Sequence, residues 1–81
     1  MELKDTITLM TSEDYRERLV AEYRQLCIRE TKLGMMLSDY DDGRLDFEPM
    51  CSTDLLRWQL SAMDAYRKAL ERRAEVEGIE L

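Results

Sequence analysis

One stretch constrains this chain more than any other. Residues 55–77 contain no Gly or Pro and are dense in Leu, Ala, Met, Arg and Glu, which predicts a long helix. At roughly 100° per residue, the apolar side chains gather on one side of that helix and the charged ones lie opposite. The helix therefore needs a partner on its apolar side, which consists of Leu55, Leu56, Ala62, Met63, Ala69, Leu70 and Val76.

A line of polar residues runs through the middle of this apolar side. Gln59, Tyr66 and Arg73 recur every seven residues, so they lie almost above one another on a helix. Polar groups in apolar surroundings need hydrogen-bond partners, and an unpaired guanidinium there is costly. We therefore expect Arg73 to meet either an acid of the chain, such as Glu30, or an anionic ligand.

A second helical pattern precedes the first. Thr11 or Ser12 offers an N-cap, and Gly43 is a suitable left-handed residue at the end. These signals predict a helix over residues 12–40, with Glu30 as the one charge in its main stripe. The other members of that stripe are Tyr15, Leu19, Tyr23, Leu26, Leu33, Leu37 and Tyr40.

Terminal signals also delimit the segments that follow. Pro49 keeps residues 41–51 non-helical, Ser52 caps a helix over residues 52–77, and Gly78 ends it. The predicted fold is thus all-α, a helical hairpin of two long antiparallel helices. This hairpin domain covers residues 11–81, and an N-terminal extension of residues 1–10 precedes it as a short strand or an ordered arm.

A further apolar stripe suggests that the hairpin associates with copies of itself. Ala21, Ile28 and Met35 recur every seven residues on nearly the opposite side of the first helix, where the second helix cannot cover them. A chain of 81 residues buries only about 60% of its unfolded surface on its own. We expect a homo-oligomeric bundle, a dimer or a tetramer; the alternative is that these are scattered surface residues.

Composition excludes several classes of function. The net charge of -6 disfavours duplex nucleic acid, and the absence of His removes Ser/His, Cys/His and most zinc chemistry. The acids between Asp39 and Glu48 lack the spacing of an EF-hand, and no apolar run approaches the roughly 20 residues of a membrane span. Cys27 and Cys51 are expected to be free thiols in a cytosolic protein. We predict no enzyme, no metal and no cofactor.

Several segments of the chain are specific enough to compare with known families: Ser12-Glu13-Asp14-Tyr15, Glu22-Tyr23, residues 43–51, Leu55-Leu56, Gln59, Met63 and residues 73–81. These segments resemble the small crAss-like-phage-related protein family, found mainly in phages and prophages. The resemblance covers roughly residues 10–81, and its loop and C-terminal tail are the most specific parts. Where the family often has Pro after the loop Cys, this chain has Ser52.

The resemblance implies a phage-encoded helical hairpin in the cytoplasm of the infected bacterial host. Small oligomeric hairpins of phages include sponges that sequester cyclic-nucleotide or ADP-ribose signals of host immunity, an anti-CBASS-like activity. By this analogy the partner is a cyclic mono- or oligonucleotide. The residue types that such a ligand needs are guanidiniums for phosphate, rings for bases and an amide for a base edge. The candidates are Arg29, Trp58, Gln59, Tyr66 and Arg73.

Three other interpretations stay open from the sequence. Glu30 paired with Arg73, Gln59 bound to a loop carbonyl and Tyr66 in the core would make the polar line purely structural. A helical module that binds a host or phage protein through the stripe of Ala21, Ile28 and Met35 is the second candidate function, and an enzyme built on carboxylates is the third.

Overall fold

Two long helices form the body of this protein in the computed structural model, which describes residues 1–81. Helix α2 spans Tyr15–Asp41 and helix α3 spans Thr53–Glu77; a 3₁₀ turn η1 at Leu3–Thr6 and a short helix α1 at Ile7–Met10 precede them. The chain contains no strand, and the prediction of an all-α protein is confirmed.

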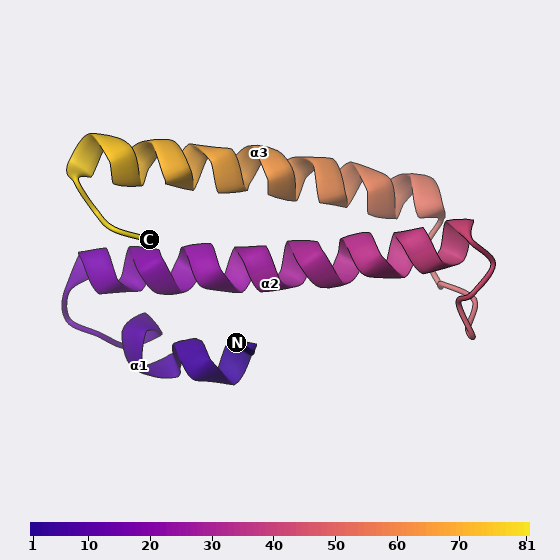
Figure 1. Cartoon of the computed structure of the whole chain (residues 1–81), viewed down its shortest axis with the longest axis horizontal. Coiled ribbons are helices and arrows are strands. Elements are labelled where there is room, and N and C mark those ends of the chain that lie inside the picture. Colours follow the sequence, from indigo (N-terminus) through magenta and orange to yellow (C-terminus); the bar gives the residue numbers. More distant parts are fainter.

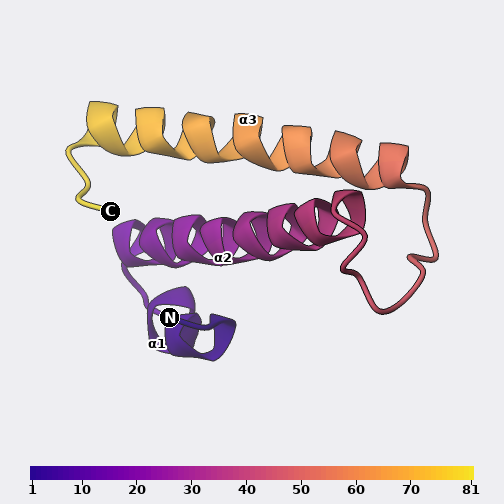
Figure 2. The same ribbon diagram turned by 45° about the vertical axis from the view of Figure 1, so that its right-hand side comes forward.

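The arrangement places α2 in the centre. Helix α3 lies along one side of α2 and runs in the opposite direction, while η1 and α1 lie against the other side (Figures 1 and 2). The molecule is accordingly elongated, with principal extents of 43 × 24 × 17 Å. None of the helices combines the length and apolar character that crossing a bilayer requires.

Helix α2 begins three residues later than predicted, because Asp14 and not Thr11 or Ser12 is its N-cap. The Asp14 carboxylate accepts a hydrogen bond from the Arg16 amide at 2.9 Å, and the Ser12 hydroxyl accepts one from the Asp14 amide at 3.1 Å. The Thr11 hydroxyl instead donates to the Ile7 carbonyl at 2.9 Å and so belongs to the end of α1.

The signals at the other helix ends are confirmed. Helix α2 ends at Asp41, one residue beyond the predicted end, and Gly43 follows with φ of 71°. The Ser52 hydroxyl accepts a hydrogen bond from the Leu55 amide at 3.2 Å at the start of α3. Gly78 has φ of 68°, and the Ile79 amide reaches back to the Ala74 carbonyl at 2.8 Å. Both glycines adopt the left-handed conformation that a side chain would strain.

The N-terminal extension forms no strand. It coils into η1 and α1 and packs on α2 around Thr6, which is fully buried. The Thr6 hydroxyl donates to the Leu3 carbonyl at 2.7 Å and accepts from the Gln25 amide at 2.8 Å. This segment lies on the side of α2 that carries Ala21, whose exposure falls to 1%. Ala21 is thus covered within the chain, and a second copy is not needed there.

The hydrophobic core lies between α2 and α3 and is small. Leu19 and Leu26 of α2 pack with Leu70 of α3, and Tyr23, Met63 and Ile79 surround them. Leu37 and Ala74 are also buried. Because Leu70 is only 2% exposed and lies at the centre of this cluster, the pairing of the two long helices depends strongly on it.

We predict that Leu70→Ala lowers the free energy of unfolding by about 2–5 kcal/mol through lost burial and a residual cavity. Urea denaturation followed by circular dichroism measures this value. Met50→Ala is the matched control, since Met50 is fully exposed and its truncation should leave stability almost unchanged. Equal losses in the two variants would contradict the assigned core.

Candidate functional site

Helix α3 is rotated about its axis relative to the predicted orientation. The residues that face α2 are Met63, Arg67, Leu70 and Ala74, at helical spacings of three and four. Gln59, Tyr66 and Arg73, expected at the centre of the contact, are all exposed. Leu55 and Val76 are also outside the contact, at 47% and 68% exposure. The polar line therefore lies on the surface and is not buried between the helices.

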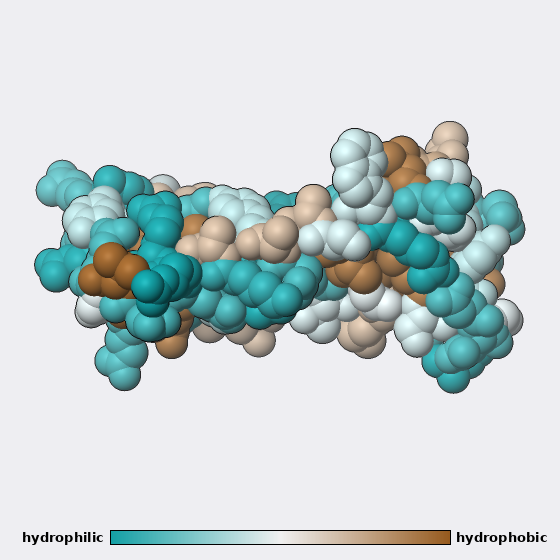
Figure 3. Space-filling view, turned by 90° about the horizontal axis from the view of Figure 1, so that it is seen from above, coloured by the Kyte–Doolittle hydropathy of each residue, from teal (hydrophilic) through white to brown (hydrophobic).

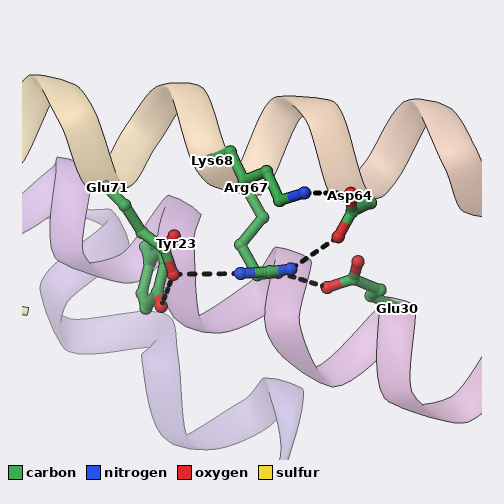
Figure 4. A network of polar contacts seen from close by, with 6 residues as sticks. All are labelled: Tyr23, Glu30, Asp64, Arg67, Lys68 and Glu71. Carbon is green, nitrogen blue, oxygen red and sulfur yellow. Dashed lines mark hydrogen bonds and ion pairs between the residues drawn. The ribbon is translucent and has the colours of Figure 1, made fainter.

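The polar residue inside the contact is Arg67, and it links three carboxylates (Figure 4). Its Nε donates to Glu30 on α2 at 2.7 Å, and its two terminal nitrogens meet Asp64 at 2.6 Å and Glu71 at 3.1 Å. Its guanidinium thus takes the place that we had expected for Arg73 as the partner of Glu30. The interpretation that Glu30 pairs with Arg73 is wrong.

Two further side chains complete this network. The Tyr23 hydroxyl donates to Glu71 at 2.7 Å, and Lys68 pairs with Asp64 at 3.0 Å. The hydrogen bond from Tyr23, followed by those from Arg67, lowers the pKa of Glu71. The partnership with Glu71 correspondingly raises the pKa of Tyr23. The pKa of Asp64 is lowered by Lys68 and then by Arg67.

This network holds the two long helices together through the contact of Arg67 with Glu30. The Glu30 and Arg67 side chains retain 18% and 26% exposure, so they are the most shielded ion pair of the chain. No group of three or more His, Cys, Asp or Glu residues is placed to hold a metal ion. We assign the network a structural role. The sequence held one signal for it, an Arg three to four residues from both Met63 and Leu70.

The five predicted ligand-binding residues are all exposed. Trp58 and Gln59, together with Leu55 and Ala62, line a shallow and mostly apolar hollow of about 270 Å³ on α3. Trp58 is 72% exposed, which is unusual for so large an aromatic side chain. This hollow is the one place where the structure brings two of the predicted residues together around a concave surface.

The other predicted ligand-binding residues of α3, Tyr66 and Arg73, lie further along the helix. Fourteen residues separate Gln59 from Arg73, which is about 21 Å along a helix, and Tyr66 lies halfway between them. Arg73 has one ion pair, with Glu77 at 3.5 Å, and its side chain is 53% exposed. One chain therefore does not gather Gln59, Tyr66 and Arg73 around a single small ligand.

Arg29 lies at the level of Tyr66. The contact between Glu30 and Arg67 aligns the two helices along their axes. Arg29 precedes Glu30 and Tyr66 precedes Arg67, so these two residues lie at nearly the same position along the helix pair. A hollow lined by Glu30, Gly34, Leu60, Ser61 and Asp64 marks one flank of the helix pair. At 100° per residue, Arg29 and Tyr66 turn toward the opposite flank.

One side of α3 is exposed along its whole length, and we call it the α3 flank. It consists of Leu55, Trp58, Gln59, Ala62, Tyr66, Ala69, Arg73 and Val76. All eight residues are exposed. In the view onto α3 from above, brown and pale atoms interrupt the teal surface along much of the length of the body (Figure 3). The flank combines rings, a guanidinium and an amide with small apolar residues, and folding of the single chain uses none of them in its core.

These observations define the class: a small all-helical protein whose exposed aromatic and cationic flank suits it to binding. Residues 13–76 match the Sequestin family, and the chain belongs to that family. The family name indicates a sequestering protein, one that binds and holds a target. No curated protein and no solved structure matches the chain. The relation to the phage-related family rests on the sequence resemblance alone.

We predict that Arg67→Ala destabilises the fold, because it strands the shielded Glu30 carboxylate and removes a bridge between helices. Arg72→Ala is the matched control, since Arg72 pairs with Glu75 on the surface at 69% exposure. Thermal and urea denaturation should show a clear loss for the first variant and almost none for the second. A silent Arg67→Ala would rule out the proposed structural role.

The lowered pKa of Glu71 predicts a dependence of stability on pH. A carboxyl whose pKa is lower in the folded state stabilises the fold above its ordinary pKa of 4.5, and this contribution disappears as pH falls through the lowered value. Tyr23→Phe removes the donor, so the pKa of Glu71 should rise toward 4.5 and the acid-induced loss of stability should shrink.

Carboxyl titration by NMR and unfolding at pH 7 and pH 3 measure these two effects. Tyr40→Phe is the control, because no hydrogen bond of the Tyr40 hydroxyl supports a carboxylate. An unchanged Glu71 titration in Tyr23→Phe would be inconsistent with the hydrogen bond as the cause.

Proposed function

We propose that this Sequestin-family protein is a phage-encoded sponge that sequesters a cyclic-nucleotide signal of host immunity. It acts without catalysis, as a homo-oligomer, in the cytoplasm of the infected bacterium, and its effect is anti-CBASS-like. The observation that carries the proposal is the α3 flank, on which Trp58, Tyr66 and Arg73 remain exposed. The family name and the resemblance to phage proteins also support a sequestering function.

The chemistry of the flank suits a nucleotide. Aromatic faces stack on bases of any sequence, at roughly 1–3 kcal/mol per base. The Arg73 guanidinium forms paired hydrogen bonds with phosphate oxygens, and the Gln59 amide can both donate to and accept from a base edge. Arg29 adds a second cation at the level of Tyr66. Because the net charge is -6, attraction for phosphate would come from these two guanidiniums and not from the chain as a whole.

A sequestering role also agrees with how the carboxylates are used. Glu30, Asp64 and Glu71 all contact Arg67, and this cation helps to lower the pKa of Asp64 and of Glu71. A general acid needs a raised carboxyl pKa near the working pH, whereas the pKa of Asp64 and of Glu71 is lowered. The network is thus suited to holding the helices in place and not to proton transfer. A bound signal molecule should therefore be released chemically intact.

The second candidate is a module that binds a host or phage protein. It is favoured by the apolar surface that α2 leaves open at Ile28 and Met35, which line a hollow with Met1, Cys27, Thr31 and Lys32. A helix of a partner could lie there. The intramolecular cover of Ala21 shortens this stripe and weakens the proposal relative to the first.

Calorimetry against a panel of cyclic mono-, di- and trinucleotides tests the proposed function. We expect one class to bind and to be recovered intact after denaturation of the protein. Recovery of a cleaved product would show an enzyme, and no binding across the panel would favour the protein-binding module.

We predict that Arg73→Ala abolishes the rise in melting temperature caused by the bound nucleotide, while the melting temperature of the free protein changes little. At a ligand concentration 100 times the Kd, the wild type gains about 2.7 kcal/mol. Arg72→Ala is the matched control on the same helix and should retain the full shift. Equal shifts in wild type and Arg73→Ala would exclude Arg73 from the site.

A further inference from the structure

The chain exposes more surface than its mass requires. Its accessible area is 5904 Å², whereas a compact monomer of 9.6 kDa exposes about 5100 Å². The excess of about 800 Å² equals the area that one partner contributes to a protein interface of ordinary size. Leu55, Trp58 and Val76 contribute to this excess, since each is an apolar side chain about half or more exposed.

The α3 flank is symmetric along the helix. Leu55 and Val76 lie equally far from the midpoint between Ala65 and Tyr66, and so do Ala62 and Ala69. In two identical antiparallel helices related by a two-fold axis at that midpoint, such positions face each other. Leucine then meets valine and alanine meets alanine, and the alanines allow the two helix axes to approach closely.

The hollow on α3 has the form that this pairing requires. Leu55, Trp58, Gln59 and Ala62 stand at spacings of three, four and seven, which is the four-residue hole that receives a side chain of a facing helix. In the antiparallel register, the residue at the level of this hole is Arg73 of the second copy. Within one chain the hollow contains no cation, but in the pair Arg73 of the second copy lies beside it.

We propose that two copies of this chain pair antiparallel through the α3 flank, and that each ligand site is shared between them. Trp58 and Gln59 of one copy form the site together with Arg73 of the other copy. The pairing itself is independent of any ligand, whereas the assignment of a nucleotide to the shared site rests on the proposed function.

The shared site explains two features that a single chain leaves open. Gln59 and Arg73 are about 21 Å apart within one helix, yet they lie at one level across the pair. The Arg73 guanidinium, which has only the exposed Glu77 as a partner in its own chain, reaches the face of Trp58 in the copy, where a cation is favoured. A phosphate then binds the guanidinium while its base stacks on the ring.

This geometry fixes the stoichiometry. The dimer contains two equivalent sites about 21 Å apart along the helices, with a Tyr66 from each copy between them. A cyclic dinucleotide is too short to reach both sites, so each site takes one nucleotide ligand and the dimer takes two.

Cysteine cross-linking tests the register. In a Cys27→Ser, Cys51→Ser background, Ala62→Cys is mixed with Ala69→Cys under mild oxidation. We expect a disulfide-linked dimer from the mixture and none from either variant alone. Two copies of residue 62 are offset by about 10 Å along the axis, beyond the 4.4–6.8 Å that a disulfide allows between Cα atoms. Cross-linking of Ala62→Cys alone, or no cross-link in the mixture, would overturn the register.

Complementation between copies tests the shared site, with a radiolabelled cyclic dinucleotide as the probe. Arg73→Ala and Trp58→Leu each damage both sites of their own dimer, and each should weaken binding by about tenfold or more. In a mixed dimer one site contains the intact Trp58 of the first variant and the intact Arg73 of the second. We expect mixing to restore wild-type affinity at one site per mixed dimer, half of the wild-type number. Since random pairing of equal amounts makes about half of the dimers mixed, the whole mixture should bind about a quarter as much ligand as the wild type.

The two experiments separate the failure of each idea. If the mixture cross-links and wild type binds no nucleotide, the antiparallel pairing stands and the proposed function is lost. If wild type binds nucleotide and mixing restores nothing, the proposed function stands and the shared site is overturned.

Discussion

The contact of Arg67 with Glu30 determines how this protein is assembled. Only seven of the 81 residues are buried, so the core alone gives the two long helices few constraints on their relative rotation. A shielded guanidinium has far stricter requirements than a leucine, because leaving it or its acid unpaired is expensive. Once Arg67 turns toward α2, Leu70 and Ala74 must follow it into the core, and Tyr66 and Arg73 must turn out to the solvent. The exposed flank, and every binding property that we assign to it, follow from that rotation.

The sequence was sufficient where the determining chemistry is local. The caps at Ser52 and Gly78, the turn at Gly43 and the all-helical character depend on side chains within a few residues of one another, and the structure confirms them. The start of α2 was ambiguous because Thr11, Ser12 and Asp14 can all cap a helix. In the structure the Thr11 hydroxyl bonds to the Ile7 carbonyl at the end of α1 and is therefore not the cap of α2. The local sequence does not indicate this hydrogen bond.

The orientation of α3 could not be predicted because its apolar residues cover too much of its circumference. Met63 and Leu70 indicate one face, Ala62 and Ala69 indicate the neighbouring face, and both are compatible with a helix that packs on one partner. What distinguishes them is a contact between residues 37 positions apart, Glu30 and Arg67. The prediction therefore places Gln59, Tyr66 and Arg73 between the helices, although these three residues lie on the surface, where a ligand can reach them.

Because α2 lies between the N-terminal segment and α3, its residues tolerate fewer substitutions than the outward residues of α3. Substitutions on α2 meet packed neighbours on two sides, at Thr6 and at Leu70, so most of them carry a penalty in folding. The outward residues of α3 have no such neighbours within the chain. Residues such as Trp58 or Gln59 can therefore be replaced without disturbing the packing that holds the scaffold of the single chain together.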